Sequence, residues 1–126
     1  MQILVIDDDD GLRKSMGMVL ESLGHQVVLV SNVVDGLARA EEERFDVAMT
    51  DMNMPGLDGL EAVKALRNID PPIGIIAMSG GSIRSSAEDY SVLALNMGAG
   101  VFLPKPFKRV DVARAIEQAI AKRDDK

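Results

Sequence analysis

The stretch that decides the fold is ILVIDDDD, residues Ile3–Asp10, in which four apolar residues are followed directly by four aspartates. Three of the apolar residues are β-branched, which favours a buried β-strand. Two carboxylates roughly 4 Å apart repel each other by about 4 kcal/mol at an effective dielectric constant of about 20. Because so much negative charge ends the strand, we expect a cation to be bound there.

The rest of the chain alternates between apolar strand-like runs and amphipathic helix-like runs. Strands are expected at Ile3–Ile6, Gln26–Val30, Val47–Thr50, Ile73–Met78 and Gly100–Leu103. Helical patterns are expected at Leu12–Leu23, Val34–Glu41, Leu60–Arg67, Ser86–Met97 and Val112–Ile120, with Gly24 and Gly98 at helix C-terminal caps. Five strand–helix units predict the α/β class, with a parallel sheet covered by helices on both faces.

Composition narrows the class of protein. With 126 residues, 47% apolar and 27% charged, the chain is expected to form one globular domain. No apolar run approaches the roughly 18 residues of a membrane span, and no basic region precedes the first strand as in a signal peptide, so a cytoplasmic location is expected. The absence of cysteine excludes a disulfide scaffold and a thiolate metal site, and the net charge of −6 argues against nucleic-acid binding.

Ligands of open α/β sheets bind outside the carboxyl ends of the strands. At these ends the sequence places Asp7–Asp10, Asp51–Asn53, Ser79 and Lys105. Oxygen ligands without cysteine or paired histidine suit Mg²⁺ or Mn²⁺. A carboxylate held against such an ion can act as a nucleophile toward phosphorus, while a lysine and a hydroxyl hold the phosphoryl oxygens.

Four segments carry a resemblance to a known family: VIDDDDGLRKS, AMTDMNMPGLDGLE, IIAMSG and FLPKPF. Their order and spacing resemble the receiver domain of two-component response regulators, of the single-domain type found in chemotaxis regulators. The resemblance extends from Ile3 to about Ile120. It implies a flavodoxin-like (βα)5 fold, doubly wound around a five-stranded parallel sheet of order 2-1-3-4-5, with the receiver domain at residues 1–122 and a polar tail at 123–126.

The resemblance also implies a role for each matching residue. Asp51 matches the phosphoacceptor. The implied ligands of Mg²⁺ or Mn²⁺ are Asp7, Asp8, Asp51 and the backbone carbonyl of Asn53. The implied phosphate-contacting and switch residues are Ser79, Lys105 and Phe102, and the Lys105–Pro106 bond is expected to be cis. Asp9 and Asp10 would lie outside the site, at the start of the first helix, where acids suit the helix dipole. Arg13 follows the second acid by five residues, as is usual in the family.

The implied function is signalling. A sensor histidine kinase or a histidine phosphotransfer protein would phosphorylate Asp51, and an output protein would then bind the face formed by the fourth helix, fifth strand and fifth helix. The chain would be no enzyme beyond its own phosphorylation and slow dephosphorylation. A homodimer is left open. Gly80 and Gly81 depart from the family pattern, and the lengthened loop after them is expected to be mobile.

Alternative functions are weighed on single residues. A receiver-like docking module that takes no phosphate stays open. An aspartyl-nucleophile phosphatase needs an acid where Asn53 stands. In a flavodoxin-like nucleotide site, Asp7–Asp10 would repel the phosphate of the bound ligand. A calcium loop fails because Met18 stands where a glutamate is needed.

His25 is expected to be exposed rather than catalytic. Core positions are expected for Met16, Met49, Met78 and Met97, and rim positions for Met52 and Met54.

Overall fold

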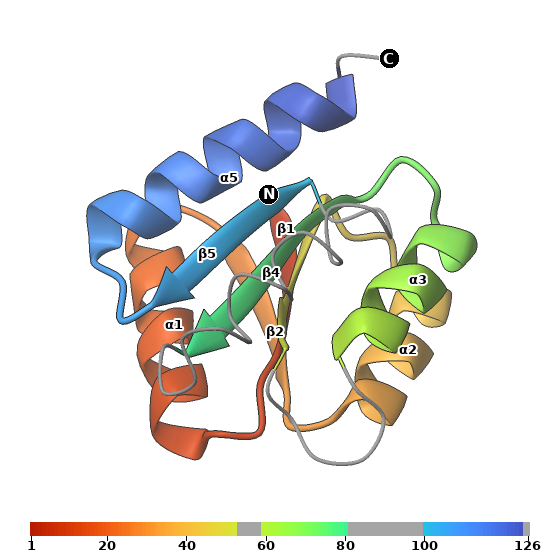
Figure 1. The fold of residues 1–126 in the computed structure, drawn as a ribbon, viewed down its shortest axis with the longest axis horizontal. Helices are drawn as coiled ribbons and strands as arrows, with labels where there is room; N and C mark the ends of the chain where they lie inside the picture. The colour runs from red at the N-terminus through yellow and green to blue at the C-terminus, as the bar shows by residue number, and fades with distance from the viewer. Residues whose placement is uncertain (53–58, 81–99, 125–126) are drawn as a thin grey trace.

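The computed structural model, which describes residues 1–52, 59–80 and 100–124, contains a five-stranded parallel sheet (Figure 1). Its strands are β1 (Gln2–Ile6), β2 (Gln26–Val30), β3 (Val47–Asp51), β4 (Gly74–Gly80) and β5 (Val101–Lys105). Their order is β2-β1-β3-β4-β5, and every neighbouring pair is parallel. The expected α/β class and strand order are confirmed.

Helices cover both faces of the sheet (Figure 1). The described helices are α1 (Asp10–Ser22), α2 (Val33–Glu42), α3 (Gly59–Ile69) and α5 (Arg109–Asp124). The pair α1 and α5 packs on one face, and the pair α2 and α3 on the other. The helix expected near Ser86–Met97, the cap at Gly98 and the loop after Gly80 lie outside the described residues. None of the described helices has the length and apolar character needed to cross a bilayer.

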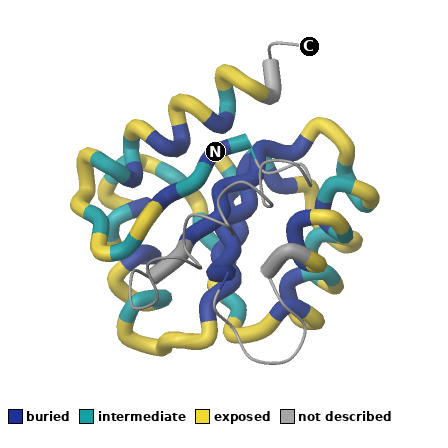
Figure 2. The backbone as a smooth tube through the Cα atoms, viewed as in Figure 1, coloured by how far each residue is buried: buried dark blue, intermediate teal, exposed yellow. Residues whose placement is uncertain are grey.

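The core consists of two layers, one on each side of the sheet. Along β1, Leu4 and Ile6 pack toward α2 and α3, whereas Ile3 and Val5 pack toward α1 and α5. All four are fully buried, and the buried band follows the sheet through the molecule (Figure 2). Burying one such side chain contributes about 1.5–3 kcal/mol. Because both faces are covered, the strands read as nearly continuous apolar runs instead of alternating ones.

Polar side chains cap the first turns of α1 and α2 and so fix where these helices begin after strands β1 and β2. Asp9 caps α1 by accepting a hydrogen bond from the backbone N–H of Leu12 at 3.1 Å, and Asn32 caps α2 through the N–H of Asp35 at 2.8 Å. After α1 the chain turns at Gly24, whose φ of +91° suits glycine. Because α1 begins directly after its cap Asp9, only Asp7–Asp9 connect β1 to α1.

The described methionines confirm the predicted core positions but not the predicted rim position. Met16, Met49 and Met78 are buried as expected, and Met97 lies outside the described residues, as does Met54. Met52 was expected at the rim of the site, and this is wrong, because it is 2% exposed and packs in the layer beneath α2 and α3. The sheet geometry continues one residue beyond β3, since the N–H of Met52 donates to the carbonyl of Met78 at 2.7 Å.

Gly36 of α2 lies so close to β1 that it leaves no room for a side chain. A Cβ atom there would sit 2.5 Å from Cδ1 and 2.8 Å from Cγ1 of the fully buried Ile6. We expect Gly36→Ala to lower the free energy of unfolding by about 1–3 kcal/mol, because Ile6 must move within a packed core. The matched control is Gly11→Ala in the exposed first turn of α1, where the nearest atom is 3.5 Å away and stability should not fall. Equal losses in urea denaturation would contradict the close packing of α2 on β1.

Thr50 carries a buried hydroxyl without a hydrogen-bond partner among the described residues. It is 0% exposed, on β3 between Ile6 of β1 and Ala77 of β4. Thr50→Val replaces the hydroxyl with a methyl group of similar shape and should raise the free energy of unfolding by about 1 kcal/mol. Thr50→Ser keeps the hydroxyl, loses a methyl group and should lower it by about 1 kcal/mol. A loss of stability in Thr50→Val, measured by urea denaturation, would contradict this prediction.

Candidate functional site

Three carboxylates meet at the carboxyl edge of the sheet. Asp7 and Asp8 follow β1, Asp51 ends β3, and these two strands are neighbours. One oxygen of each carboxylate lies within 4.8 Å of the others. Asp7 is 1% exposed and Asp51 is 3% exposed, whereas Asp8 is exposed to solvent. The edge therefore combines two buried negative charges with an opening to water on the side of Asp8.

Lys105 brings a positive charge between the two buried carboxylates. Its Nζ lies 3.2 Å from Oδ2 of Asp7, to which it donates a hydrogen bond, and 3.4 Å from Oδ2 of Asp51. Lys105 ends β5, which is separated from β3 by β4, so the long side chain reaches across one strand. Because buried charges are costly unless they are paired, this ammonium offsets part of the repulsion between the carboxylates.

The backbone around Asp7 and Lys105 is closely defined. Oδ1 of Asp7 accepts a hydrogen bond from the N–H of Asp9 at 2.9 Å, and the carbonyl oxygen of Asp7 accepts one from Nη1 of Arg13 at 2.8 Å. The Lys105–Pro106 peptide bond is cis, the geometry that the resemblance implies. From the sequence, Arg13 was known only as a residue usual at this position in the family. Its spacing of five residues from Asp8 did not predict the contact with the Asp7 carbonyl.

The remaining predicted site residues are described to different extents. Asn53 lies outside the described residues. Ser79 lies near the end of β4, opposite Pro104 of β5, and only its backbone is described. Phe102 is half-buried on β5 opposite Ala77 and packs against the core layer of α2 and α3. The structure therefore brings together Asp7, Asp8, Asp51 and Lys105, and the roles of all these residues stay predictions.

His25 lies apart from this cluster. It directly precedes β2 and so lies at the amino ends of the strands, whereas the cluster lies at their carboxyl ends. Its Nδ1 is 3.3 Å from the amino group of Met1. Partial burial lowers the pKa of His25, the positive charge of the amino terminus lowers it further, and Asp46 opposes both effects. A role for this histidine in chemistry at the carboxylates is excluded by its position.

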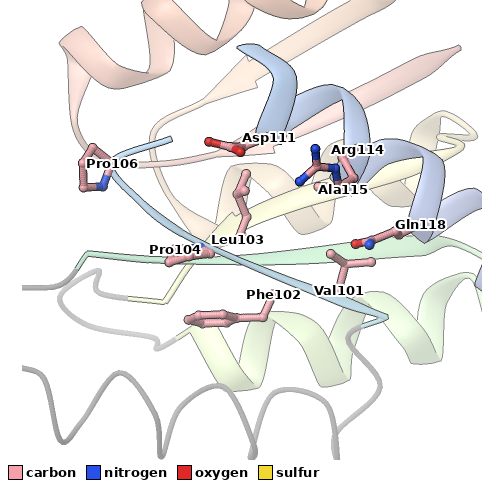
Figure 3. A pocket seen from close by; sticks show the side chains of 9 residues that line it. All are labelled: Val101, Phe102, Leu103, Pro104, Pro106, Asp111, Arg114, Ala115 and Gln118. Carbon is pink, nitrogen blue, oxygen red and sulfur yellow. The ribbon is translucent and has the colours of Figure 1, made fainter. Parts of the chain in front are cut away.

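A cavity of about 220 Å³ borders β5 and α5 (Figure 3). Figure 3 shows the side chains of α5 on one side of β5 and Phe102 on the other. The cavity is lined by Phe102, Pro104 and Pro106 together with Asp111, Arg114 and Gln118 of α5. One lining residue, Pro106, directly follows Lys105 in the chain, so the cavity and the carboxylate cluster share the end of β5.

Comparison with known proteins agrees with this geometry. FixJ, a transcriptional regulatory protein of Bradyrhizobium diazoefficiens, is 35% identical over 94% of this chain and 56% of its own length. PrrA, a transcriptional regulatory protein of Mycobacterium tuberculosis, is 33% identical over 97% of this chain and 51% of its own length. The chain thus spans about half the length of these relatives.

Solved structures and family membership point the same way. A response regulator receiver domain from Clostridium thermocellum has a TM-score of 0.87 and 32% identity, covering 97% of this chain and 95% of that one. Residues 3–117 match the family described as response regulator receiver domain. A match over this share of the chain, on a sheet of order 2-1-3-4-5 with acids at its edge, shows that the chain belongs to the response regulator receiver domain family.

Proposed function

We propose that this chain is a phosphoacceptor that takes a phosphoryl group onto Asp51 from a phosphohistidine of a sensor kinase or phosphotransfer protein. One observation carries the proposal: the carboxylates of Asp7, Asp8 and Asp51 converge within 4.8 Å, with Nζ of Lys105 3.4 Å from Asp51. A nucleophile, acids that suit a cation and a fixed positive charge are the parts that phosphoryl transfer to a carboxylate needs.

The donor set fits a hard divalent cation. The described cluster offers three carboxylates, two of them buried, and Mg²⁺ prefers oxygen ligands of this kind. Asp7, Asp8 and Asp51 would hold the ion, and Asn53 would add its backbone carbonyl if the family pattern applies. When bound, Mg²⁺ or Mn²⁺ supplies positive charge that neutralises the carboxylates and the phosphoryl oxygens.

The side chains of the chain account for the transfer itself. A carboxylate oxygen of Asp51 attacks phosphorus, the P–O bond forms as the P–N bond to the donor imidazole breaks, and the imidazole leaves with the bonding electron pair. Lys105 already lies against Asp51, so its ammonium is placed to contact the oxygens of the incoming group. By the family pattern, the hydroxyl of Ser79 would donate to the same oxygens.

The signal would travel along β4 and β5. Phe102 lies opposite Ala77, two residues before Ser79 on β4, and borders the cavity between β5 and α5. A shift of Ser79 toward a phosphoryl group would therefore alter the packing next to Phe102 and the surface around this cavity. We propose that an output partner binds this face in the phosphorylated state.

The alternative functions have less support. In a phosphatase with an aspartyl nucleophile, an acid two residues later protonates the leaving group, and here Asn53 cannot transfer protons. A docking module without phosphorylation would not require Asp7, Asp8, Asp51 and Lys105 to converge. Receiver domains are signalling modules, and a signal requires a phosphorylated state that persists. Family membership therefore favours a phosphoacceptor and not a phosphatase with rapid turnover.

Asp51→Asn tests the phosphoacceptor directly. The wild-type chain, mixed with Mg²⁺ and acetyl phosphate, should gain the mass of one phosphoryl group, and Asp51→Asn should gain none because an amide is a poor nucleophile. Asp9→Asn is the matched control, since asparagine caps a helix as well as aspartate does and this variant should still be modified. A mass gain in Asp51→Asn would contradict the assignment.

Lys105→Met tests the charge balance of the cluster. Removing the ammonium leaves Asp7 and Asp51 buried without it, so the free energy of unfolding in metal-free buffer should fall by about 3–5 kcal/mol. Added Mg²⁺ should restore stability, because a ligand that binds only the native state stabilises it. Thermal melting should therefore show a larger Mg²⁺-dependent rise in Lys105→Met than in wild type. Lys14→Met, on the exposed surface of α1, is the control, and equal behaviour of the two variants would contradict the prediction.

A further inference from the structure

Arg13, in the first turns of α1, reaches back to the main chain of the carboxylate cluster. Its Nη1 donates a hydrogen bond to the carbonyl oxygen of Asp7 at 2.8 Å, and its Nη2 forms an ion pair with Asp10. The Arg13 side chain is only 19% exposed, whereas that of Asp10 is 89% exposed. The guanidinium therefore lies against the protein interior, and its inner contact is with a backbone atom and not with a carboxylate.

This contact completes the hydrogen bonding of Asp7. The N–H of Asp7 donates to the carbonyl of Val30 on β2 at 3.1 Å, and its two carboxylate oxygens accept from Asp9 and Lys105. The carbonyl oxygen lies one residue beyond the end of β1, where the ladder with β2 stops, and Arg13 supplies its donor. Each polar atom of Asp7 is thus held by a different part of the chain.

The restraint matters because the connection it holds is short and carries two of the candidate ligands. Only Asp7–Asp9 join β1 to α1, and Asp9 is engaged as the cap of the helix. The carbonyl of Asp9 accepts the first helical hydrogen bond, from the backbone N–H at position 13, at 2.9 Å, so the end of the connection is held by the helix itself. The side chain of Arg13 holds its beginning, at the carbonyl of Asp7, and this limits how far the backbone that carries Asp7 and Asp8 can move from Asp51.

We infer that Arg13 is a positioning residue of the divalent-cation site, acting through the carbonyl of Asp7 and not through its charge. This inference rests on the cation site of the proposed function. The two ways in which Arg13 could act predict opposite results. A positive charge near the site repels a cation, so removing it would tighten binding, whereas removing a residue that positions the ligands would weaken binding.

Isothermal titration of the whole chain with MgCl₂, and separately with MnCl₂, separates these two roles. Arg13→Met should weaken cation affinity by about 10- to 100-fold, the usual loss when a residue that orients ligands is removed, even though the site becomes more negative. Arg13→Lys keeps the charge but replaces the planar guanidinium and should also lose affinity, by about tenfold. The two-dimensional NMR spectrum of each variant, recorded without metal, should show the amide signal of Asp9 displaced while signals of β4 stay in place.

Two matched controls separate this contact from general effects. Asp10→Asn removes the exposed ion pair but leaves the bond from Arg13 to Asp7, so its affinity should stay within about twofold of wild type. Arg39→Met removes an arginine of α2 that forms an ion pair with Glu43, the residue that caps the end of this helix, and should leave affinity unchanged. Both titrations are run at a temperature at which circular dichroism shows every variant to be folded.

The outcomes are distinguishable. Measurable cation binding by wild type with a loss in both Arg13 variants supports the inference. If wild type binds and Arg13→Met binds equally well or better, the positioning role is overturned while the proposed function stands. If wild type takes up neither cation at millimolar concentration, both proposals fail. Wild-type affinity in Arg13→Lys overturns the inference whether or not Arg13→Met folds, because the charge alone would then be sufficient.

Discussion

The mutual repulsion of three carboxylates at one edge of the sheet is the constraint on which the rest of the structure depends. Asp7 and Asp51 are almost fully buried, so their charges are tolerated only with compensation from nearby groups. In the described part of the chain this compensation comes from Lys105, which ends the edge strand β5 and reaches both carboxylates. The fold thereby links the site to β5 and α5, the elements that border the cavity beside it.

The sequence was sufficient for the fold because its signals are local and redundant. Runs such as Ile3–Ile6 and Val47–Met49 are apolar without alternation, and this occurs where a parallel sheet is covered on both faces. Once those strands are parallel, their carboxyl ends must share an edge, and this places Asp7, Asp8, Asp51 and Lys105 on the same side of the molecule. Their close approach also required the order of the strands, in which β1 is next to β3, and that order came from the family resemblance.

The contacts that could not be predicted are those decided by side-chain direction. From the sequence, Arg13 was placed only at a position usual in the family, and the geometry of the first turns of α1 shows its guanidinium against the Asp7 carbonyl. Met52 was misplaced because the strand pattern was ended at Thr50, whereas the sheet continues past Asp51 and turns Met52 into the core. The lone hydroxyl of Thr50 leaves no trace in a sequence pattern, since threonine is an ordinary strand residue.

The central claim is that Asp51 is the residue that receives phosphorus. An acyl phosphate is reduced by borohydride, whereas a free carboxylate is not, so the modified position can be located along the chain. The most direct measurement is to treat the wild-type chain with Mg²⁺ and acetyl phosphate, reduce it with sodium borohydride and sequence its peptides by tandem mass spectrometry. The account predicts homoserine at position 51 and no other modified residue. Modification at Asp7, Asp8 or elsewhere, or no modification at all, would contradict it.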